Sequence, residues 1–191
     1  MSNNTRTKNI EKLATGDFYS GEQLGHEFGI SRAAIAKHIQ ALTEMGLDIF
    51  RVTGKGYRLS SPVNLLDKEK IRSYLAPADI PEIELFHELD STNSHLLRKL
   101  PHHIRDGQIC LTEFQHAGRG RRGRQWISPF ASNIYFSQYR FLEQGMSAAM
   151  GLSIVAAIAV FDTVKELYHE NVQLKWPNDV YLDNKKLAGI L

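Results

Sequence analysis

The sequence predicts an α+β protein made of two parts. Up to Pro62, apolar residues recur at helical spacing and are followed by a glycine-rich hairpin. After Pro62, short helices and strands intermix without regular βαβ alternation, which is typical of a mixed or antiparallel sheet. Pro62 follows Ser60 and Ser61, and this composition suits a linker. We therefore expect one domain over residues 1–62 and a second over residues 63–191.

Composition is that of an ordinary globular protein. Hydrophobic residues make up 42% of the 191 residues and charged residues 23%, and the formal net charge of +2 does not mark a nucleic-acid binder. The lone Cys110 excludes an internal disulfide, fits a reducing compartment and has the apolar neighbours of a core residue. The N-terminus lacks a signal-peptide pattern, and the apolar stretch 148–161 is shorter than the ~20 residues that span a bilayer. We expect a cytoplasmic protein with no membrane partner.

Three helices are expected in the first part. Gly29 is a favoured stop for the second helix, and Ser31 can cap the third by accepting a bond from a free backbone N–H. Apolar residues at spacings of four and three would form one buried stripe on the third helix: Ile35, Ile39 and Leu42. Ile10, Leu13 and Ala14 give the first helix an amphipathic turn.

Two helices joined by a short turn and followed by a hairpin are typical of a winged helix-turn-helix, whose second helix enters the DNA major groove. Residues 48–52 and 57–59 are predicted strands joined by a glycine-rich turn at 53–56. The residues expected at DNA are the cap and outward positions of the third helix and basic residues of the hairpin: Ser31, Arg32, Ala33, Lys37, Gln40, Arg51 and Lys55, with Arg58 also available for phosphates. A helical module used for protein contacts is the alternative.

The second part is expected to begin with a short helix at 68–75, capped by Asp67. A second helix follows the polar cluster 90–93 and stops at Pro101. Strands are predicted at residues 83–86, 108–114, 133–139, 172–175, 180–182 and, after a turn at 183–184, 186–191. Residues 147–168 are expected to form a long buried helix.

A run of four arginines and three glycines extends from Gly118 to Arg124 and is followed by Gln125 and Trp126. Glycines let the chain fold tightly round a ligand, and guanidinium groups donate to phosphate or carboxylate oxygens. The run matches neither a P-loop nor a Rossmann fingerprint. A solvated basic loop or a nucleic-acid patch is the alternative, but such patches mix Lys with Arg and need no regular glycine spacing. Binding of a small anion is therefore favoured.

Two further clusters could carry chemistry. Residues 175–179 offer polar groups where a strand meets a turn, although they could equally form a structural turn. Lys186 returns towards them and needs a partner or an anion, while Lys185 should point to the opposite face. Residues 90–93 could be only a helix cap, or could bind a neutral polar ligand such as a urea or amide. We find neither zinc-type histidine spacing nor a nucleophile–base set, so neither a zinc site nor a covalent enzyme intermediate is expected.

The motifs together closely resemble those of the bifunctional biotin–protein ligase and biotin operon repressor family. They are the winged-helix pattern and residues 90–93, 115–126, 175–179 and 186–189. The resemblance implies that the biotin carboxylate attacks the α-phosphate of ATP, with Mg²⁺ assisting, to give biotinyl-5′-AMP and pyrophosphate. A lysine of biotin carboxyl carrier protein then attacks the mixed anhydride. It also implies a repressor that, with biotinyl-5′-AMP as corepressor, forms a homodimer and binds operator DNA.

The resemblance also implies roles for individual residues. The catalytic group would be Lys186, Arg121 and Arg119. The biotin-binding group would be Ser91, Thr92, Asn93, Gln115, Arg119, Gly120, Arg121, Lys186 and Gly189. The nucleotide-binding group would be Arg121, Trp126, Lys175, Asn178 and Asp179. The glycine-rich loop is expected to be mobile when empty and to order around the adenylate.

The chain departs from the family pattern at Leu191, inside a predicted strand. Family members continue through more of the catalytic domain and a small C-terminal barrel-like domain, so a catalytic domain truncated at its C-terminal side is expected. The first alternative is a transcription regulator that senses a biotin-like ligand without ligating it. The second is a relative acting on lipoate or octanoate, whose site would lack a polar cluster for a ureido head group.

Overall fold

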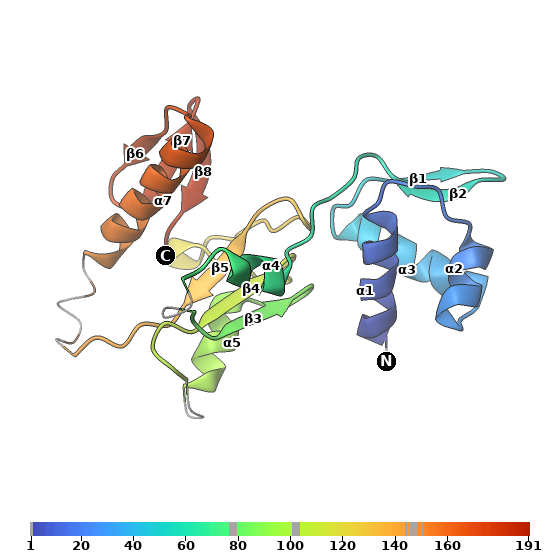
Figure 1. The fold of residues 1–191 in the computed structure, drawn as a ribbon, viewed down its shortest axis with the longest axis horizontal. Helices are drawn as coiled ribbons and strands as arrows, with labels where there is room; N and C mark the ends of the chain where they lie inside the picture. Colours follow the sequence, from blue (N-terminus) through green and yellow to red (C-terminus); the bar gives the residue numbers. More distant parts are fainter. Residues whose placement is uncertain (1, 77–79, 101–103, 144, 146–148, 150) are drawn as a thin grey trace. The chain divides into compact units, whose positions relative to one another are not determined.

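The computed structural model describes residues 2–76, 80–100, 104–143, 145, 149 and 151–191, with side chains from Lys8 onward (Figure 1). These residues divide into two compact units. Unit 1 comprises Met1–Arg119 and Gln125–Tyr139, and unit 2 comprises Gly120–Arg124 and Arg140–Leu191. Pro62 lies inside unit 1, and the domain boundary expected there stays a prediction.

The first part of unit 1, which we call the helical module, contains three helices and a hairpin. Its elements are α1 (Ser2–Leu13), α2 (Gly21–Phe28), α3 (Arg32–Glu44), β1 (Ile49–Val52) and β2 (Gly56–Leu59). The predicted cap at Ser31 is confirmed, because its Oγ accepts a bond from the backbone N–H of Ala34. Gly29 ends α2 in the left-handed conformation at φ 67°, as predicted.

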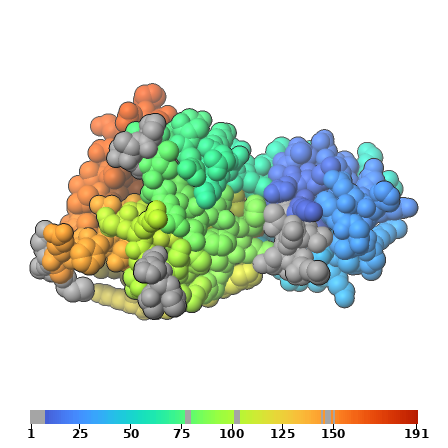
Figure 2. Space-filling view, turned by 60° about the horizontal axis from the view of Figure 1, so that its bottom comes forward, coloured from blue at the N-terminus to red at the C-terminus, as the bar shows by residue number. Residues whose placement is uncertain are grey.

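The core of the helical module is the stripe predicted on α3. Ile35 and Leu42 are fully buried and Ile39 is 6% exposed. They pack with Leu13 of α1 and Leu24 of α2. In the space-filling view the blue residues of the three helices form one closely packed body (Figure 2). The antiparallel pair β1–β2 completes the winged helix-turn-helix pattern expected from the sequence.

The rest of unit 1 is a mixed three-stranded sheet with one helix on its face. The elements are α4 (Lys68–Ser73), β3 (Ile83–Phe86), α5 (Thr92–Lys99), β4 (Ile109–Thr112) and β5 (Tyr135–Gln138). β3 runs parallel to β4, and β4 runs antiparallel to β5, which confirms the predicted mixed sheet. α5 connects the parallel strands and packs against β4 and β5 (Figure 1). The predicted stop at Pro101 lies outside the described residues.

Unit 2 is an antiparallel meander packed against a helix. It contains a 3-10 turn at Arg121–Gly123, α7 (Leu152–Tyr168), β6 (Gln173–Lys175), β7 (Asp179–Leu182) and β8 (Lys185–Gly189). Ala157 of α7 packs on Val172 and Val180 of the meander. The strands agree with the predicted ones to within a residue or two.

The prediction of a long buried helix at 147–168 is wrong for the described part, and residues 147, 148 and 150 lie outside it. Ala157 is the one described residue of α7 that is buried, and Val155 is 62% exposed. The physical reason is that α7 is apolar on several sides, while the meander covers one face. Periodicity predicted the helix correctly but could not predict how much of its surface would be covered.

Candidate ligand-binding site

A polar network lies where β3 and β4 end at the same edge of the sheet. The parallel pairing continues past the strands as a bridge between Leu89 and Gln115. Thr92 then donates twice to Gln115 Oε1, from its backbone N–H at 3.0 Å and from its hydroxyl at 3.2 Å. The Thr92 hydroxyl is also 2.8 Å from the hydroxyl of Ser137 on β5. Thr92 is 3% exposed, so these hydrogen bonds hold a buried polar centre in one geometry.

Gln115 is oriented by its other end as well. Its Nε2 donates to Ser128 Oγ at 3.3 Å, and Ser128 Oγ donates to the carbonyl of Trp126 at 3.5 Å. With its Oε1 committed to Thr92 and one N–H to Ser128, the Gln115 amide keeps a second N–H for an acceptor. A ureido or amide group presents such an acceptor.

The polar cluster 90–93 forms the helix cap considered from the sequence, and its role at a ligand stays a prediction. Ser91 is a helix cap, since its Oγ accepts a bond from Ser94 N at 3.4 Å. Asp90 forms a bidentate pair with Arg98, with oxygen–nitrogen distances of 2.6 and 2.9 Å. The Arg98 guanidinium lowers the pKa of Asp90 to about 2. Asn93, the last residue of this cluster, is exposed, so a ligand could reach it.

Below the network, α5 is fastened to the sheet by a second set of polar contacts. Glu84 of β3 accepts from Gln108 Nε2 at 2.9 Å, pairs with Lys99 Nζ at 2.9 Å and lies 3.1 Å from His95 Nε2. Burial alone would raise the pKa of Glu84, but Lys99 and His95 hold it below its usual value. The helix that carries Thr92 is thereby fixed in place.

Gly118 packs directly against the network. A Cβ at this position would lie 3.0 Å from Gln115 Nε2, 3.1 Å from Ser128 Oγ and 3.1 Å from the Trp126 carbonyl. A side chain here would therefore displace the Gln115 amide or the chain at Trp126. Glycine is required by close approach, which explains why the arginine–glycine run begins with it.

The arginine–glycine loop is closed by main-chain hydrogen bonds. Gly120 N donates to the Arg124 carbonyl at 2.7 Å, and Trp126 N donates to the Gly118 carbonyl at 3.2 Å. Arg122 at the tip has a left-handed φ of 57°. Arg119 donates through its guanidinium to Ser94 Oγ of α5, so the first arginine of the loop reaches the helix that carries Thr92. Arg121, Arg122 and Arg124 are exposed.

In unit 2, the motif 175–179 and Lys186 are brought together as predicted. Asp179 Oδ1 lies 2.7 Å from Lys186 Nζ. Asn178 holds the end of β8 by two hydrogen bonds to Ile190. The side-chain Nδ2 of Asn178 donates to the Ile190 carbonyl at 2.5 Å, and the backbone carbonyl of Asn178 accepts from Ile190 N at 2.9 Å. Gly189 stands opposite Asp179 in the β7–β8 register. Lys186, for which the sequence predicted a partner or an anion, is therefore paired with the carboxylate of Asp179.

Two further side chains of the motif 175–179 lie at its start. Lys175 Nζ lies 5.1 Å from the ring centroid of Tyr181, and Trp176 is 82% exposed.

In the described residues, no group of three or more His, Cys, Asp and Glu side chains could hold a metal ion. Across the same residues, no helix is long and apolar enough to cross a membrane.

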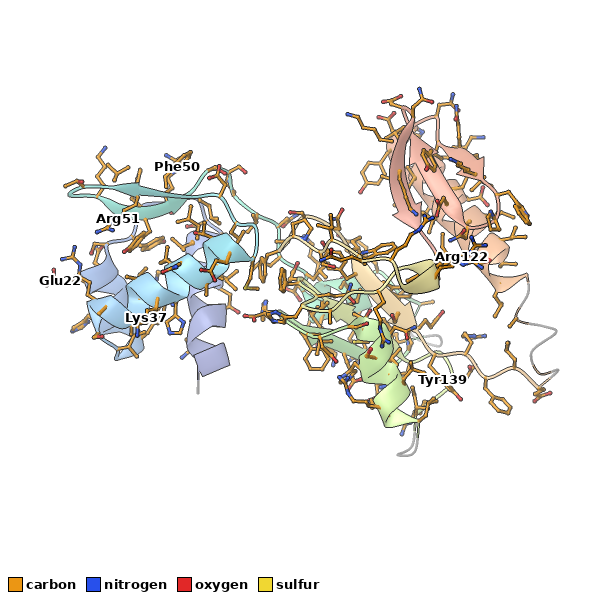
Figure 3. All side chains as sticks on the ribbon, turned by 180° about the vertical axis from the view of Figure 1, so that it is seen from behind. Glu22, Lys37, Phe50, Arg51, Arg122 and Tyr139 are labelled. Carbon is orange, nitrogen blue, oxygen red and sulfur yellow. The ribbon has the colours of Figure 1, made fainter. Side chains whose placement is uncertain are left out.

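The residues expected at DNA lie on the surface of the helical module. Lys37 projects from α3 and Arg51 from the β1–β2 hairpin (Figure 3). All the predicted side chains are exposed: Ser31, Arg32, Ala33, Lys37, Gln40, Arg51 and Lys55. Gln40 also donates to Glu44 at 3.1 Å, and Lys55 lies 5.7 Å from the ring centroid of Phe18. Ser31 and Arg32 border a shallow hollow at the turn between α2 and α3.

The structure groups the predicted site residues into two sets. Ser91, Thr92, Gln115 and Arg119 lie together in unit 1, and Asn178, Asp179, Lys186 and Gly189 lie together in unit 2. That the arginine loop and Lys186 face one pocket stays a prediction. Sequence reasoning missed Ser94, Ser128 and Ser137, since isolated serines carry no local signal and their partners are distant in the chain.

Comparison with known protein families gives two matches along the chain. A model of the biotin/lipoate A/B protein ligase family matches residues 85–191, and a model of an HTH domain matches residues 6–58. The expected order of a helix-turn-helix followed by a mixed-sheet ligase region is thereby confirmed. Neither match crosses Pro62.

Individual relatives agree with this assignment. The chain is 50% identical over 182 residues to Bifunctional ligase/repressor BirA of Salmonella typhimurium, and 48% identical over 192 residues to the Escherichia coli protein of that name. These alignments cover 95% and 100% of this chain but only 56% and 59% of the relatives. The chain therefore spans less than two thirds of their length, and the predicted resemblance to ligase/repressor proteins is confirmed over that span.

A solved structure has a similar fold over part of this chain. The biotin protein ligase from Aquifex aeolicus in complex with biotin and ATP aligns with a TM-score of 0.52 and 30% identity, over 59% of this chain and 46% of that one. The ligase-family model covers more than half of the 191 residues, and the chain belongs to the biotin/lipoate A/B protein ligase family.

Proposed function

We propose that this chain carries the biotin-activating site of an ATP-dependent biotin–protein ligase that is also a DNA-binding repressor. The observation that supports this most directly is the buried Thr92–Gln115 network, with Arg119 donating to the same helix. Buried polar groups in fixed geometry suit the neutral ureido head of biotin. The adjacent cationic loop suits the carboxylate and phosphates that meet during activation.

The proposed first step joins two anions. An oxygen of the biotin carboxylate bonds to the α-phosphorus of ATP, the bond to the bridging oxygen breaks, and pyrophosphate leaves. Arg119, Arg121 and Lys186 would hold the two anions together and stabilise the charge that develops on the phosphate, which is the main contribution a protein makes to such a step. Trp126, Lys175 and Asn178 would contact the nucleotide. In the second step a lysine amine of a biotin carboxyl carrier protein displaces AMP and takes the biotinyl group.

Mg²⁺ fits these residues as an ion bound mainly through ATP. Mg²⁺ is usually held by one or two carboxylates together with substrate phosphates. Asp179 supplies one carboxylate, and it already lies beside the Lys186 ammonium. Bound there, Mg²⁺ would neutralise phosphate charge, while Lys186 and the arginines position the reacting oxygens.

Repression would use the helical module. Its exposed residues on α3 and the hairpin would contact operator DNA. Biotinyl-5′-AMP would act as corepressor by favouring a homodimer. The two helical modules of that dimer would match the two half-sites of the operator. The exposed Lys37 and Arg51 of one module support this part of the proposal (Figure 3). The protein would act in the cytoplasm.

Biotin-dependent exchange of labelled pyrophosphate into ATP tests the first step. We expect exchange with biotin and none with lipoate or octanoate, followed by transfer to a carrier domain. Biotin binding without exchange would support a biotin-sensing regulator instead. Exchange driven by lipoate would support the lipoate alternative.

Arg121→Ala tests the role of the loop, with Arg72→Ala as the matched control because Arg72 is an exposed arginine of α4. We expect the Arg121 variant to release biotinyl-5′-AMP faster by about tenfold or more, and the control to behave as the parent. Equal release from both variants would remove Arg121 from the site.

A further inference from the structure

Phe130 joins the ligand-holding segment to the helical module. It follows the arginine–glycine loop in sequence, yet its ring is 1% exposed and packs in the core that contains Leu13, Leu42 and Met45. Aromatic rings of this size contribute much of the packing in a small core. The segment 126–130 is therefore held at its far end by a part of the chain that precedes it by some eighty residues.

Backbone contacts fix the same end. Phe130 N donates to the Met45 carbonyl at 3.0 Å, just after α3, and Ala131 N donates to the Glu113 carbonyl at 3.1 Å, just after β4. Ala131 adopts a left-handed φ of 51°, so the chain turns directly after these two hydrogen bonds. Gly46 lets the chain after α3 approach Pro129 closely, since a Cβ at Gly46 would lie 3.2 Å from Pro129 Cβ.

The other end of the segment holds the polar network. Ser128, which is 6% exposed, accepts from Gln115 Nε2 and donates to the Trp126 carbonyl. Only Pro129 separates Ser128 from Phe130, and a proline restricts the backbone between them. A shift of Phe130 would therefore move Ser128 and release the amide of Gln115.

We propose that Phe130 is a positioning residue of the biotin site, through which the helical module keeps Ser128 and Gln115 in their binding geometry. This inference rests on the proposed function, because it assigns Gln115 to the ligand. Phe130 itself touches no ligand in this proposal. It acts by anchoring the segment 126–130 in the core of the helical module.

The test measures biotin affinity of the full chain by titration, with thermal melting recorded for each variant. Phe130→Ala is expected to weaken biotin binding by about tenfold or more, since a displacement of ~1 Å far from a ligand can have such an effect. Phe130→Leu, which keeps most of the buried volume, should bind nearly as the parent does. The matched control is Leu24→Ala, which opens a cavity in the same core from α2.

A second variant reaches the same contact from the opposite side. Gly46→Ala adds a methyl group against Pro129 without changing the segment 126–130, so it should also weaken biotin binding even if Phe130→Ala fails to fold. Because Gly46 has a φ of 97°, alanine also strains the backbone there, and the melting temperature of this variant is compared with that of Leu24→Ala. Hydrogen exchange gives an independent measure: the Thr92 and Trp126 amides should exchange faster in the Phe130 and Gly46 variants than in Leu24→Ala.

The outcomes are distinct. Biotin affinity that falls equally in Leu24→Ala and Phe130→Ala would reduce Phe130 to a core residue and overturn the inference. Unchanged affinity in both Phe130→Ala and Gly46→Ala would overturn it as well. A parent protein that binds no biotin would instead contradict the proposed function.

Discussion

The Lys186 ammonium lies 2.7 Å from Oδ1 of Asp179, across the β7–β8 hairpin. Both side chains are partly open to solvent, with exposed fractions of 44% and 22%, so solvent screens the pair, although Asp179 Oδ1 itself is buried. Its consequence is positional: the pair keeps a cation at the first residue of β7, next to Asn178, which fixes the end of β8. An incoming phosphate or carboxylate would meet Lys186 already placed.

Lys186→Met should reduce biotin-dependent pyrophosphate exchange by about 100-fold if Lys186 has the proposed role, because a charged donor to the reacting oxygens is then lost. The free energy of unfolding should fall by about 1–3 kcal/mol, because the buried Asp179 Oδ1 loses its cation. Lys185→Met is the matched control and should leave exchange unchanged. Similar losses in both variants would mean that overall charge, and not the position of Lys186, matters.

Thr92→Val should destabilise the protein by about 1–3 kcal/mol in denaturant unfolding, because Ser137 loses a buried hydrogen-bond partner and Gln115 loses one donor. Biotin binding should weaken as well, since Gln115 is then less firmly oriented. Thr92→Ser keeps the hydroxyl and should restore most of the affinity. Failure of the serine variant to do so would show that the methyl group is what matters.

Gly118→Ala should weaken biotin binding by about tenfold, or ~1.4 kcal/mol, because its Cβ would press on Gln115 Nε2. Gly151→Ala is a suitable control, since no heavy atom lies within 4 Å of a Cβ built there. Binding titrations on both variants give the comparison. Parent-like affinity in Gly118→Ala would show that the network can shift to admit a methyl group.

Acid should remove the stabilisation that comes from Asp90 and Arg98. The pKa of Asp90 is lowered to about 2 by Arg98 in the folded protein, from a usual value of 3.8. A carboxyl group whose pKa is lower in the folded than in the unfolded protein stabilises the fold at pH values above its unfolded pKa. This stabilisation is lost as the pH falls through the folded pKa. The melting temperature of Arg98→Ala should therefore lie below that of the parent at pH ~6 and approach it near pH ~2. A constant difference across this range would exclude the pair as its cause.

Lys37→Ala should weaken binding to a random-sequence DNA duplex and lower the slope of log affinity against log salt by about 1, as expected for one lost phosphate contact. Lys70→Ala removes the same charge from α4, outside the helical module, and serves as the control. A fluorescence titration at several salt concentrations measures both. An unchanged slope for Lys37→Ala would place that residue away from the phosphates.

Features that depend on neighbouring residues were predictable from the sequence. The caps at Ser31 and Asp67 and the stop at Gly29 follow from local hydrogen bonding and backbone freedom, and the structure contains all three. The buried stripe on α3 was predictable for the same reason, because helical geometry alone brings its residues to one side. The arginine–glycine loop and the motif 175–179 were identified because their composition is rare.

Other features depend on contacts between distant segments, and only the tertiary structure decides those. The sequence contains no sign that Ser137 reaches Thr92, that Ser128 orients Gln115, or that Phe130 enters the core of the helical module. The partial exposure of α7 was mispredicted for this reason, because burial depends on what the rest of the chain covers. The sequence by itself determined the elements, their caps and the residue types available for chemistry. The tertiary structure decided which of them meet, since packing joins residues whose separation along the chain carries no periodic signal.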